Sequence, residues 1–293
     1  MTARQSNFQA IGTHWSIQVQ DKITAALWNE TMQSVHSRIQ NFDQAYSRFR
    51  GDSLVTRMSK LPGKHNLASD GYDLLHFYNQ LYVATNGKVT PLIGQAVADA
   101  GYDASYTFKP RRMQQPPDWE STISYTNDSI TLNQPALLDF GAAGKGYLVD
   151  VVGELLETKG LRSFTINASG DILHRSEKAT SLDVGLENPL DTSEVIGIVQ
   201  LGNRSLCASA GSKRKWAKFT HIIDPVTLES PQDVIATWVI ADNTITADGL
   251  ATALCFTDAA QLLKYFSFTW AVLNKDMQLS YAKDFPVKLF QAV

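Results

Sequence analysis

Apolar residues recur at helical spacing in three long stretches of the chain, which predicts three amphipathic helices. The first stretch runs from about Thr24 to Phe49, with the apolar positions Leu27, Val35, Ile39, Phe42 and Tyr46. The second follows Ser69, a suitable N-cap, and stops before Gly87; its apolar positions are Leu74, Leu75, Tyr78, Leu81 and Tyr82. The third ends at Gly160, with the apolar positions Leu148, Val151, Val152, Leu155 and Leu156.

Between these helices, short apolar runs separated by turn residues predict strands. The region Ile11–Val19 alternates as a strand would, and an apolar run that ends at Asp139 is also strand-like. Further runs cover residues 122–125, 129–132, 163–166, 172–174, 196–201 and 238–241. Two shorter helices, at about Thr246–Phe256 and from Asp258, precede a closing hairpin. Because strands and helices are mixed without strict alternation, we predict an α+β protein with one compact domain over residues 1–293.

Composition and charge are those of an ordinary globular protein. Hydrophobic residues make up 44% of the 293 residues and charged residues 19%, with a formal net charge of −3. This balance gives no reason to expect nucleic acid as a partner. A short basic run with one tryptophan, Lys213–Lys218, could steer a polyanion or stack on single-stranded nucleic acid, but a solvated hairpin is the favoured interpretation. The cysteines Cys207 and Cys255 lack the spacing of a metal site or a disulfide framework.

Neither the apolar windows of the chain nor its first residues indicate a membrane protein. The chain has no uninterrupted apolar window of about 18 residues, so no membrane span is predicted. The first residues lack a cationic stretch followed by an apolar run, and no signal peptide is visible. A cytoplasmic location is therefore the expectation.

The segment Asp139-Phe-Gly-Ala-Ala-Gly-Lys-Gly-Tyr-Leu-Val-Asp150 is typical of a phosphate-binding turn. Small residues allow a polyanion to approach the backbone, the N–H groups at a helix start favour negative charge, and Lys145 adds a full positive charge. The pattern is neither a Walker loop, which needs Ser or Thr after the lysine, nor the Gly-x-Gly-x-x-Gly dinucleotide fingerprint. A strand-to-helix turn with a solvated lysine is the alternative interpretation.

Asp248-Gly-Leu-Ala-Thr252 is the second informative segment. Positions four apart share one face of a helix, so the Asp248 carboxylate and the Thr252 hydroxyl would point the same way. Two hard oxygen donors on one face suit Mg²⁺, which shares its coordination shell with substrate phosphates. The alternative is an ordinary polar face near a helix N-terminus, where aspartate is favoured.

His221-Ile-Ile-Asp-Pro225 is the third. In a strand His221 and Ile223 would face one side, and Ile222 and Asp224 the other. A histidine at a strand end could act as a general base, although a lone histidine is more often a structural residue.

In this order, and together with three further segments, these motifs resemble the FAD:protein FMN transferases, which form the ApbE family. The resemblance covers most of the chain, from about Ile11 to Leu254. The family's Asp-x-x-Ala-x-x-Lys-Gly-Tyr-x-x-Asp, His-Ile-Ile-Asp-Pro and Ala-Asp-x-x-Ala-Thr are matched by Asp139–Asp150, His221–Pro225 and Ala247–Thr252. Its Met-Gly-Thr, Ser-x-Tyr-x-x-x-Ser and Gly-Gly-Asp resemble Ile11–Thr13, Ser47–Ser53 and Ser169–Asp171.

The resemblance implies mixed, largely antiparallel sheets flanked by helices, and an enzyme that uses Mg²⁺ and takes FAD as its substrate. Such enzymes move FMN from FAD onto a threonine or serine hydroxyl of an acceptor flavoprotein and release AMP. By the same resemblance Asp139 and Lys145 would contact FAD. The backbone carbonyl of Ala142, with Asp248 and Thr252, would hold Mg²⁺ against the pyrophosphate.

The resemblance also places residues along the cofactor and at the reacting hydroxyl. The expected cofactor-binding positions are Ile223, Ile11, Phe49 and Thr90. His221 would accept the hydroxyl proton, with Asp248 as the alternative.

Several positions depart from the family pattern. Ile11 replaces a methionine, Phe49 a tyrosine and Thr90 an aspartate. Ser209-Ala-Gly211 replaces Thr-Ser-Gly, and Val226 and Leu228 replace an arginine and a glycine. The metal-site positions are kept while much of the flavin-facing periphery differs. Two alternatives stay open: a Mg²⁺-dependent FAD pyrophosphatase that yields FMN and AMP, and a catalytically silent flavin-binding protein.

Overall fold

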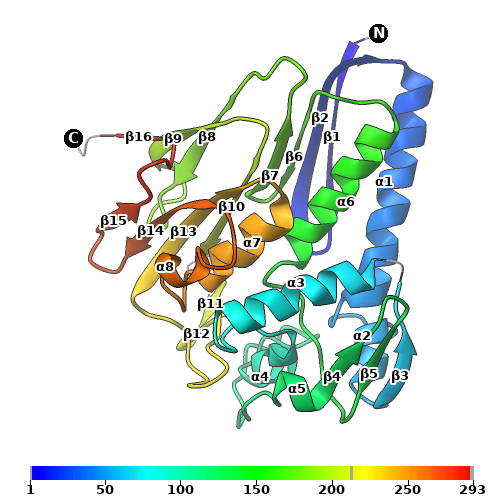
Figure 1. Ribbon diagram of the computed structural model, residues 1–293, viewed down its shortest axis with the longest axis vertical. Coiled ribbons are helices and arrows are strands. Elements are labelled where there is room, and N and C mark those ends of the chain that lie inside the picture. The colour runs from blue at the N-terminus through cyan, green and yellow to red at the C-terminus, as the bar shows by residue number, and fades with distance from the viewer. Residues whose placement is uncertain (1, 69, 212–213, 291–293) are drawn as a thin grey trace.

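In the computed structural model, which describes residues 2–68, 70–211 and 214–290, an antiparallel sheet of eight strands runs through the centre (Figure 1). The strand order is β1-β2-β6-β7-β10-β13-β14-β15. The bounds of these strands are Thr2–Ala10 (β1), Thr13–Ile23 (β2), Phe164–Ala168 (β6), Asp171–Arg175 (β7), Ser205–Ala210 (β10), Val234–Ala241 (β13), Thr269–Asn274 (β14) and Leu279–Tyr281 (β15).

Helices cover one face of this sheet, where Figure 1 shows α6 and α7 in front of the strands and α1 beside α6, to the right of β1 and β2. The principal helices are α1 (Ala25–Tyr46), α3 (Gly71–Ala84), α6 (Gly144–Thr158) and α7 (Thr244–Ala253). Their apolar stripes and the facing sheet residues form one continuous core, which includes Trp15, Val35, Leu148 and Val239. Helix α6 packs on β6 and β7, and α7 packs on β10 and β13, so the two helices lie side by side on the sheet.

A small sheet covers part of the opposite face. It consists of β8 (Leu182–Glu187), β9 (Val195–Leu201) and β16 (Val287–Leu289) in the order β16-β9-β8. Side chains along β13 alternate between the two faces of the central sheet, so this strand contributes to two apolar cores. Val239 belongs to the core under the helices, and Trp238 and Ile240 belong to the core between the central sheet and the small sheet. Strand β13 is therefore buried on both faces.

The remaining elements are shorter, and most of them lie in the lower part of the molecule in Figure 1. A third sheet pairs β3 (Gly63–Asn66), β5 (Ser129–Leu132) and β4 (Ile123–Tyr125), and a hairpin pairs β11 (Lys215–Trp216) with β12 (Phe219–Thr220). The short helices are α2 (Leu54–Met58), η1 (Pro91–Ile93), α4 (Gly94–Asp99), α5 (Trp119–Thr122) and α8 (Ala259–Leu262). None of the helices in the described ranges is both long and apolar enough to cross a bilayer.

The α+β class and the antiparallel pairing are confirmed, as are the three long helices. Thr24 caps α1 by accepting the backbone N–H of Leu27. Ser69, expected to cap the next helix, lies outside the described residues, and Asp70 occupies the N-cap position of α3. The hairpin expected for the basic run is present as β11 and β12; Lys213 lies outside the described residues.

Three strand predictions were wrong. Ile11 and Gly12, predicted within a strand, form a two-residue turn between β1 and β2, and both have a positive φ, as a type I′ hairpin turn requires. The run before Asp139 joins no sheet, since the Asp139 N–H donates to the carbonyl of Pro91 in η1. The run from His221 to Asp224, predicted as a strand, lies beyond β12, which ends at Thr220. The Thr220 hydroxyl bonds both the N–H and the C=O of Ile222 and so competes with strand pairing.

Candidate functional site

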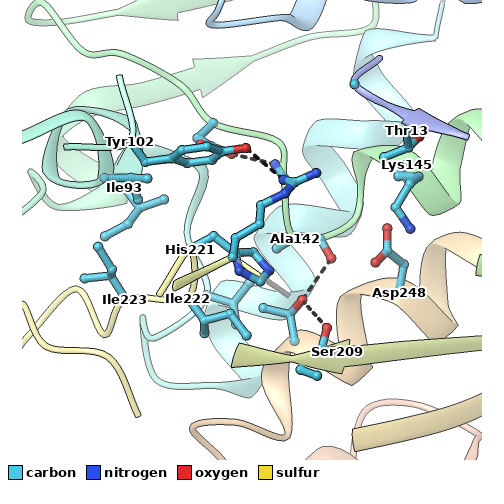
Figure 2. A pocket seen from close by; sticks show the side chains of 18 of the residues that line it. Thr13, Ile93, Tyr102, Ala142, Lys145, Ser209, His221, Ile222, Ile223 and Asp248 are labelled. Atoms are coloured by element: carbon cyan, nitrogen blue, oxygen red, sulfur yellow. Dashed lines mark hydrogen bonds between the residues drawn. The ribbon is translucent and has the colours of Figure 1, made fainter. Parts of the chain in front are cut away.

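A cavity of about 410 Å³ opens where α6 and α7 meet the loops beneath the sheet. It collects most of the residues that the sequence singled out: Phe49, Thr90, Asp139, Ala142, Lys145, His221, Ile223, Asp248 and Thr252. Ile11 is the exception, because the β1–β2 turn presents Gly12, Thr13 and His14 to the cavity instead. Figure 2 shows Lys145, Asp248 and Ser209 at one end of the cavity and Tyr102, Ile93 and Ile223 at the other.

The contact between α6 and α7 sets the position of Asp248. The Gly146 N–H on α6 donates to the Asp248 carboxylate on α7 at 2.8 Å. A Cβ at Gly146 would lie 2.4 Å from the carbonyl oxygen of Thr244, so the two helices approach this closely only because residue 146 is glycine. The Asp150 carboxylate accepts the N–H groups of Thr244 and Ile245 at 2.7 and 2.8 Å, which anchors the start of α7 on α6.

The three predicted metal ligands lie together at this polar end. The Thr252 hydroxyl is 3.4 Å from the carbonyl oxygen of Ala142 and 3.3 Å from the Ser209 hydroxyl. Asp248 precedes Thr252 by one turn on the same face of α7. Its side chain is buried, and burial raises its pKa, while the neighbouring charge of Lys145 acts in the opposite direction. The site therefore combines a carboxylate, a carbonyl and a hydroxyl, and each of these groups offers a hard oxygen donor.

Lys145 forms an ion pair with Asp171, the first residue of β7. The Asp171 side chain is almost fully buried, and its other carboxylate oxygen has no hydrogen-bond partner among the residues that the structure describes. The ammonium group thus pairs with the buried Asp171 carboxylate, and its charge also acts on the buried Asp248 carboxylate. A cation held in this way is well positioned to meet a phosphate group that enters the cavity.

Asp139 is held by Arg48, which follows α1 and has only 3% of its side chain exposed. One Asp139 oxygen accepts from the Arg48 Nε and the other from the Gly141 N–H. The Arg48 guanidinium also donates to the carbonyl of Tyr102 at 2.7 Å and stacks 4.2 Å from the centre of the Phe49 ring. These contacts therefore fix the orientation of the Asp139 carboxylate in the cavity.

The opposite end of the cavity is apolar and aromatic. Ile93, Val97 and Ile223 pack with the ring of Tyr102, and Phe49 packs edge-on against that ring. The Tyr102 hydroxyl accepts a hydrogen bond of 2.9 Å from Arg214. This end is built from three segments that are far apart in the sequence, and it offers flat apolar surfaces bordered by cations.

His221 sits between the two ends. Its backbone N–H donates to the carbonyl of Arg214, and its ring Nδ1 is buried without a hydrogen-bond partner within the described ranges. Burial, and then the charge of Arg214, lower the pKa of His221 to about 4. The imidazole is therefore neutral at physiological pH, and one ring nitrogen carries a lone pair. Thr90, the residue in place of the family's aspartate, uses its hydroxyl to cap η1 by accepting the Leu92 N–H.

Two hairpin turns border the polar end. Ser169 has φ of +53° in the β6–β7 turn, and its hydroxyl bonds both the N–H and the C=O of His14 in the β1–β2 hairpin. Ser169 stands where the family motif has glycine. The left-handed backbone is unfavourable for serine, and the two hydrogen bonds to the neighbouring hairpin offset that cost.

Four residues of the site were missed by the sequence analysis: Arg48, Tyr102, Asp171 and Arg214. Arg48 and Asp171 lie inside motifs that were recognised, and Arg214 lies in the basic run, so their charges were a usable signal. Tyr102 has no local pattern that could have revealed it.

A cavity with cations and oxygen donors at one end and flat apolar surfaces at the other has the features of a candidate site for a nucleotide-type phosphate ester. The chain belongs to the ApbE family, since the model of that family matches residues 11–272. A Treponema pallidum relative named FAD:protein FMN transferase is 26% identical over 276 residues, which cover 84% of this chain and 76% of the relative. A Rhodobacter capsulatus protein of the same name is 29% identical over 140 residues, 45% of this chain and 27% of that protein.

Solved structures share the fold over nearly the whole chain. The flavin transferase ApbE from Vibrio cholerae superposes with a TM-score of 0.81 at 18% identity, covering 97% of this chain and 98% of the other. The ApbE protein from Thermotoga maritima gives a TM-score of 0.81 at 17% identity, covering 96% and 97%. The fold expected from the family resemblance is thereby confirmed.

Proposed function

We propose that this protein is a Mg²⁺-dependent FAD:protein FMN transferase that moves FMN from FAD to a serine or threonine hydroxyl of an acceptor flavoprotein and releases AMP. The observation that carries the proposal is the convergence of Ala142, Asp248 and Thr252 beside Lys145 at one end of a single cavity. Family membership and the activity named for the relatives support the same function.

The polar end fits Mg²⁺ by the chemistry of its donors. Asp248 supplies the one charged ligand, and Ala142 and Thr252 supply neutral oxygens, which leaves room for substrate phosphate oxygens in the shell. Burial makes the bare Asp248 carboxylate costly, as the raised pKa indicates, and a cation would offset that cost. When bound, Mg²⁺ would neutralise charge on the pyrophosphate.

The two ends of the cavity match the two parts of a dinucleotide. Lys145 at the polar end would pair with the pyrophosphate, exchanging part of its contact with Asp171 for phosphate oxygens. Ile223 and the Phe49 and Tyr102 rings offer apolar faces on which a flat ring system can lie. Arg48 would act indirectly, by holding Asp139 and Tyr102 in place.

The proposed reaction is a phosphoryl-type transfer. The acceptor hydroxyl oxygen forms a bond to the phosphorus of the FMN phosphate, the bond from that phosphorus to the bridging oxygen breaks, and AMP leaves with the bridging oxygen. The hydroxyl proton passes to His221, whose neutral ring has a lone pair to receive it. Asp248 is less suited to this role, because one of its oxygens is already bonded to the Gly146 N–H and the carboxylate is assigned to the metal.

Mass spectrometry of an acceptor domain after incubation with the protein, FAD and Mg²⁺ tests the proposal. We expect a covalent FMN adduct on one hydroxyl and one AMP released per adduct. Omission of Mg²⁺, or its chelation, should abolish both products. AMP release without any acceptor would instead identify an FAD pyrophosphatase, and FAD binding with neither product would identify a silent flavin-binding protein.

A further inference from the structure

A surface rich in arginine and exposed aromatic rings adjoins the aromatic end of the cavity. We define this basic–aromatic surface by Tyr106, Phe108, Arg111, Arg112, Arg214 and Lys218. Tyr106 is 48% and Phe108 44% exposed, which is unusual for aromatic side chains that are this close to a core cluster. Arg111, Arg112, Arg214 and Lys218 are exposed as well.

The surface is continuous with the cavity through ring contacts. The Tyr106 ring stacks on Phe49 at 5.2 Å with an interplanar angle of 2°, and Phe49 lines the cavity. Phe108 lies 5.7 Å from Trp216 of the β11–β12 hairpin, and Arg214 at the start of that hairpin reaches into the cavity. A molecule that rests on this surface can therefore extend a side chain toward the cofactor.

The loop that carries the surface is tied to the neighbouring elements. The Arg111 N–H donates to the carbonyl of Asp99 at the end of α4, and the Gln115 amide donates to the carbonyl of Val226 in the turn that follows His221 and Ile223. Tyr106 and Phe108 both have φ of +50°, a left-handed backbone that is strained for aromatic residues. These two hydrogen bonds therefore connect the loop to α4 and to the turn next to the cavity residues His221 and Ile223.

The charge of this surface is opposite to that of the whole chain. Four of its six residues are cationic, whereas the chain has a formal net charge of −3. The nearest carboxylates are partly engaged: Asp99 lies 3.6 Å from Arg111, and Asp103 accepts the N–H groups of Ser105 and Thr107 and the hydroxyl of Thr107 within its own loop. The surface thus keeps an excess of positive charge beside two apolar rings.

We propose that the basic–aromatic surface is the docking site for the acceptor protein, and that it recognises an acidic segment with apolar side chains next to the flavin-receiving hydroxyl. The acidic groups would pair with Arg111, Arg112 and Lys218, and the apolar groups would cover Tyr106 and Phe108. The inference rests on the proposed transferase function, because only that function requires a second protein to reach the cavity.

Fluorescence anisotropy of labelled peptides on the FAD-loaded protein tests the proposal. The first peptide has a central threonine flanked by glutamates and leucines, and the second has glutamines in place of the glutamates. We expect the acidic peptide to bind at least about tenfold more tightly at low salt and to lose this advantage as ionic strength rises. The triple reversal R111E/R112E/K218E should abolish the preference, whereas the matched reversal K22E/K64E/K178E of exposed lysines away from the cavity should keep it.

Three results would overturn the docking site. These are equal affinity for the two peptides, an unchanged preference in R111E/R112E/K218E, or tighter binding of an oligothymidylate than of the acidic peptide, which would identify a nucleic-acid surface. FAD affinity of each variant, measured by flavin fluorescence, should match that of the unmodified chain and so confirms its fold. Failure of the unmodified protein to transfer flavin would count against the proposed function alone, since peptide binding is read without catalysis.

Discussion

The hydroxyl oxygen of Thr252 lies 3.4 Å from the carbonyl oxygen of Ala142, although 110 positions separate the two residues in the chain. Ala142 precedes α6, and Thr252 lies in the last turn of α7. The distance is short only because the two helices pack side by side on the same face of the sheet. The candidate metal site is therefore a property of the α6–α7 contact, and the predictions below test that contact and its chemistry.

Asp248→Asn should separate activity from stability. The amide is nearly the same shape but brings no negative charge, so we expect Mg²⁺-dependent flavin transfer to fall by at least about a hundredfold. Burial raises the pKa of Asp248, so the charged form is disfavoured in the folded protein, and the variant should melt at the same temperature or higher without metal. Adduct formation by mass spectrometry and thermal denaturation by circular dichroism measure the two effects. Retained transfer would refute the metal assignment.

Gly146→Ala should disrupt the site by pushing α7 away from α6. The added methyl would meet the Thr244 carbonyl oxygen at 2.4 Å and the Asp248 Cβ at 2.7 Å, and backbone atoms cannot yield easily. We expect a loss of about 2 kcal/mol or more in the free energy of unfolding, with weaker Mg²⁺ binding. Gly202→Ala is the matched control, because a Cβ at Gly202 meets nothing within 4 Å. Equal urea denaturation midpoints for the two variants would contradict the proposed close approach.

Asp150→Ala should loosen the start of α7. Its carboxylate is the acceptor for the N–H groups of Thr244 and Ile245, and their loss is expected to cost about 1–2 kcal/mol of stability. Asp150→Asn keeps one acceptor oxygen and should fall between the alanine variant and the unmodified protein. Because α7 carries Asp248 and Thr252, calorimetry should detect Mg²⁺ affinity falling in the same order. An unchanged affinity in Asp150→Ala would show that the metal site does not depend on this anchor.

His221 should make the protein less stable as the pH falls below about 6.5. The unfolded chain binds a proton there with a pKa near 6.5, whereas burial holds the folded pKa at about 4. The free energy of unfolding is therefore not reduced by this residue above pH 6.5. It decreases as the pH falls toward 4, by up to about 3 kcal/mol. His221→Asn cannot bind the proton, so its unfolding free energy should fall less between pH 7 and pH 4.5. Parallel pH profiles for the two proteins would disprove the low pKa.

The same low pKa predicts the acid side of the activity profile. If neutral His221 accepts the hydroxyl proton, kcat/KM, which reports groups of the free enzyme, should stay pH-independent on the acid side until the pH approaches 5. An acid limb centred near 6.5 would indicate that this histidine is exposed during turnover or that another group is the base.

Local patterns in the sequence determined much of this protein. The apolar stripes of α1, α3 and α6 predicted those helices, because each stripe has to be buried against the sheet. The spacing of Asp248 and Thr252 placed two oxygen donors on one helix face, and the small residues before Lys145 indicated a phosphate-type site. The β1–β2 turn at Ile11 was missed, because an isoleucine with positive φ contradicts the usual turn composition.

Only the tertiary structure decided which of these groups meet. The contacts of Ala142 with Thr252, Arg48 with Asp139 and Lys145 with Asp171 join residues far apart in the chain, and no local pattern encodes such a distance. Tyr102 lines the cavity, where Arg48 donates to its carbonyl and Arg214 to its hydroxyl from two other segments of the chain. The sequence by itself therefore supplied the chemical groups and their helix faces, while long-range packing of the helices on one sheet brought those groups within bonding distance.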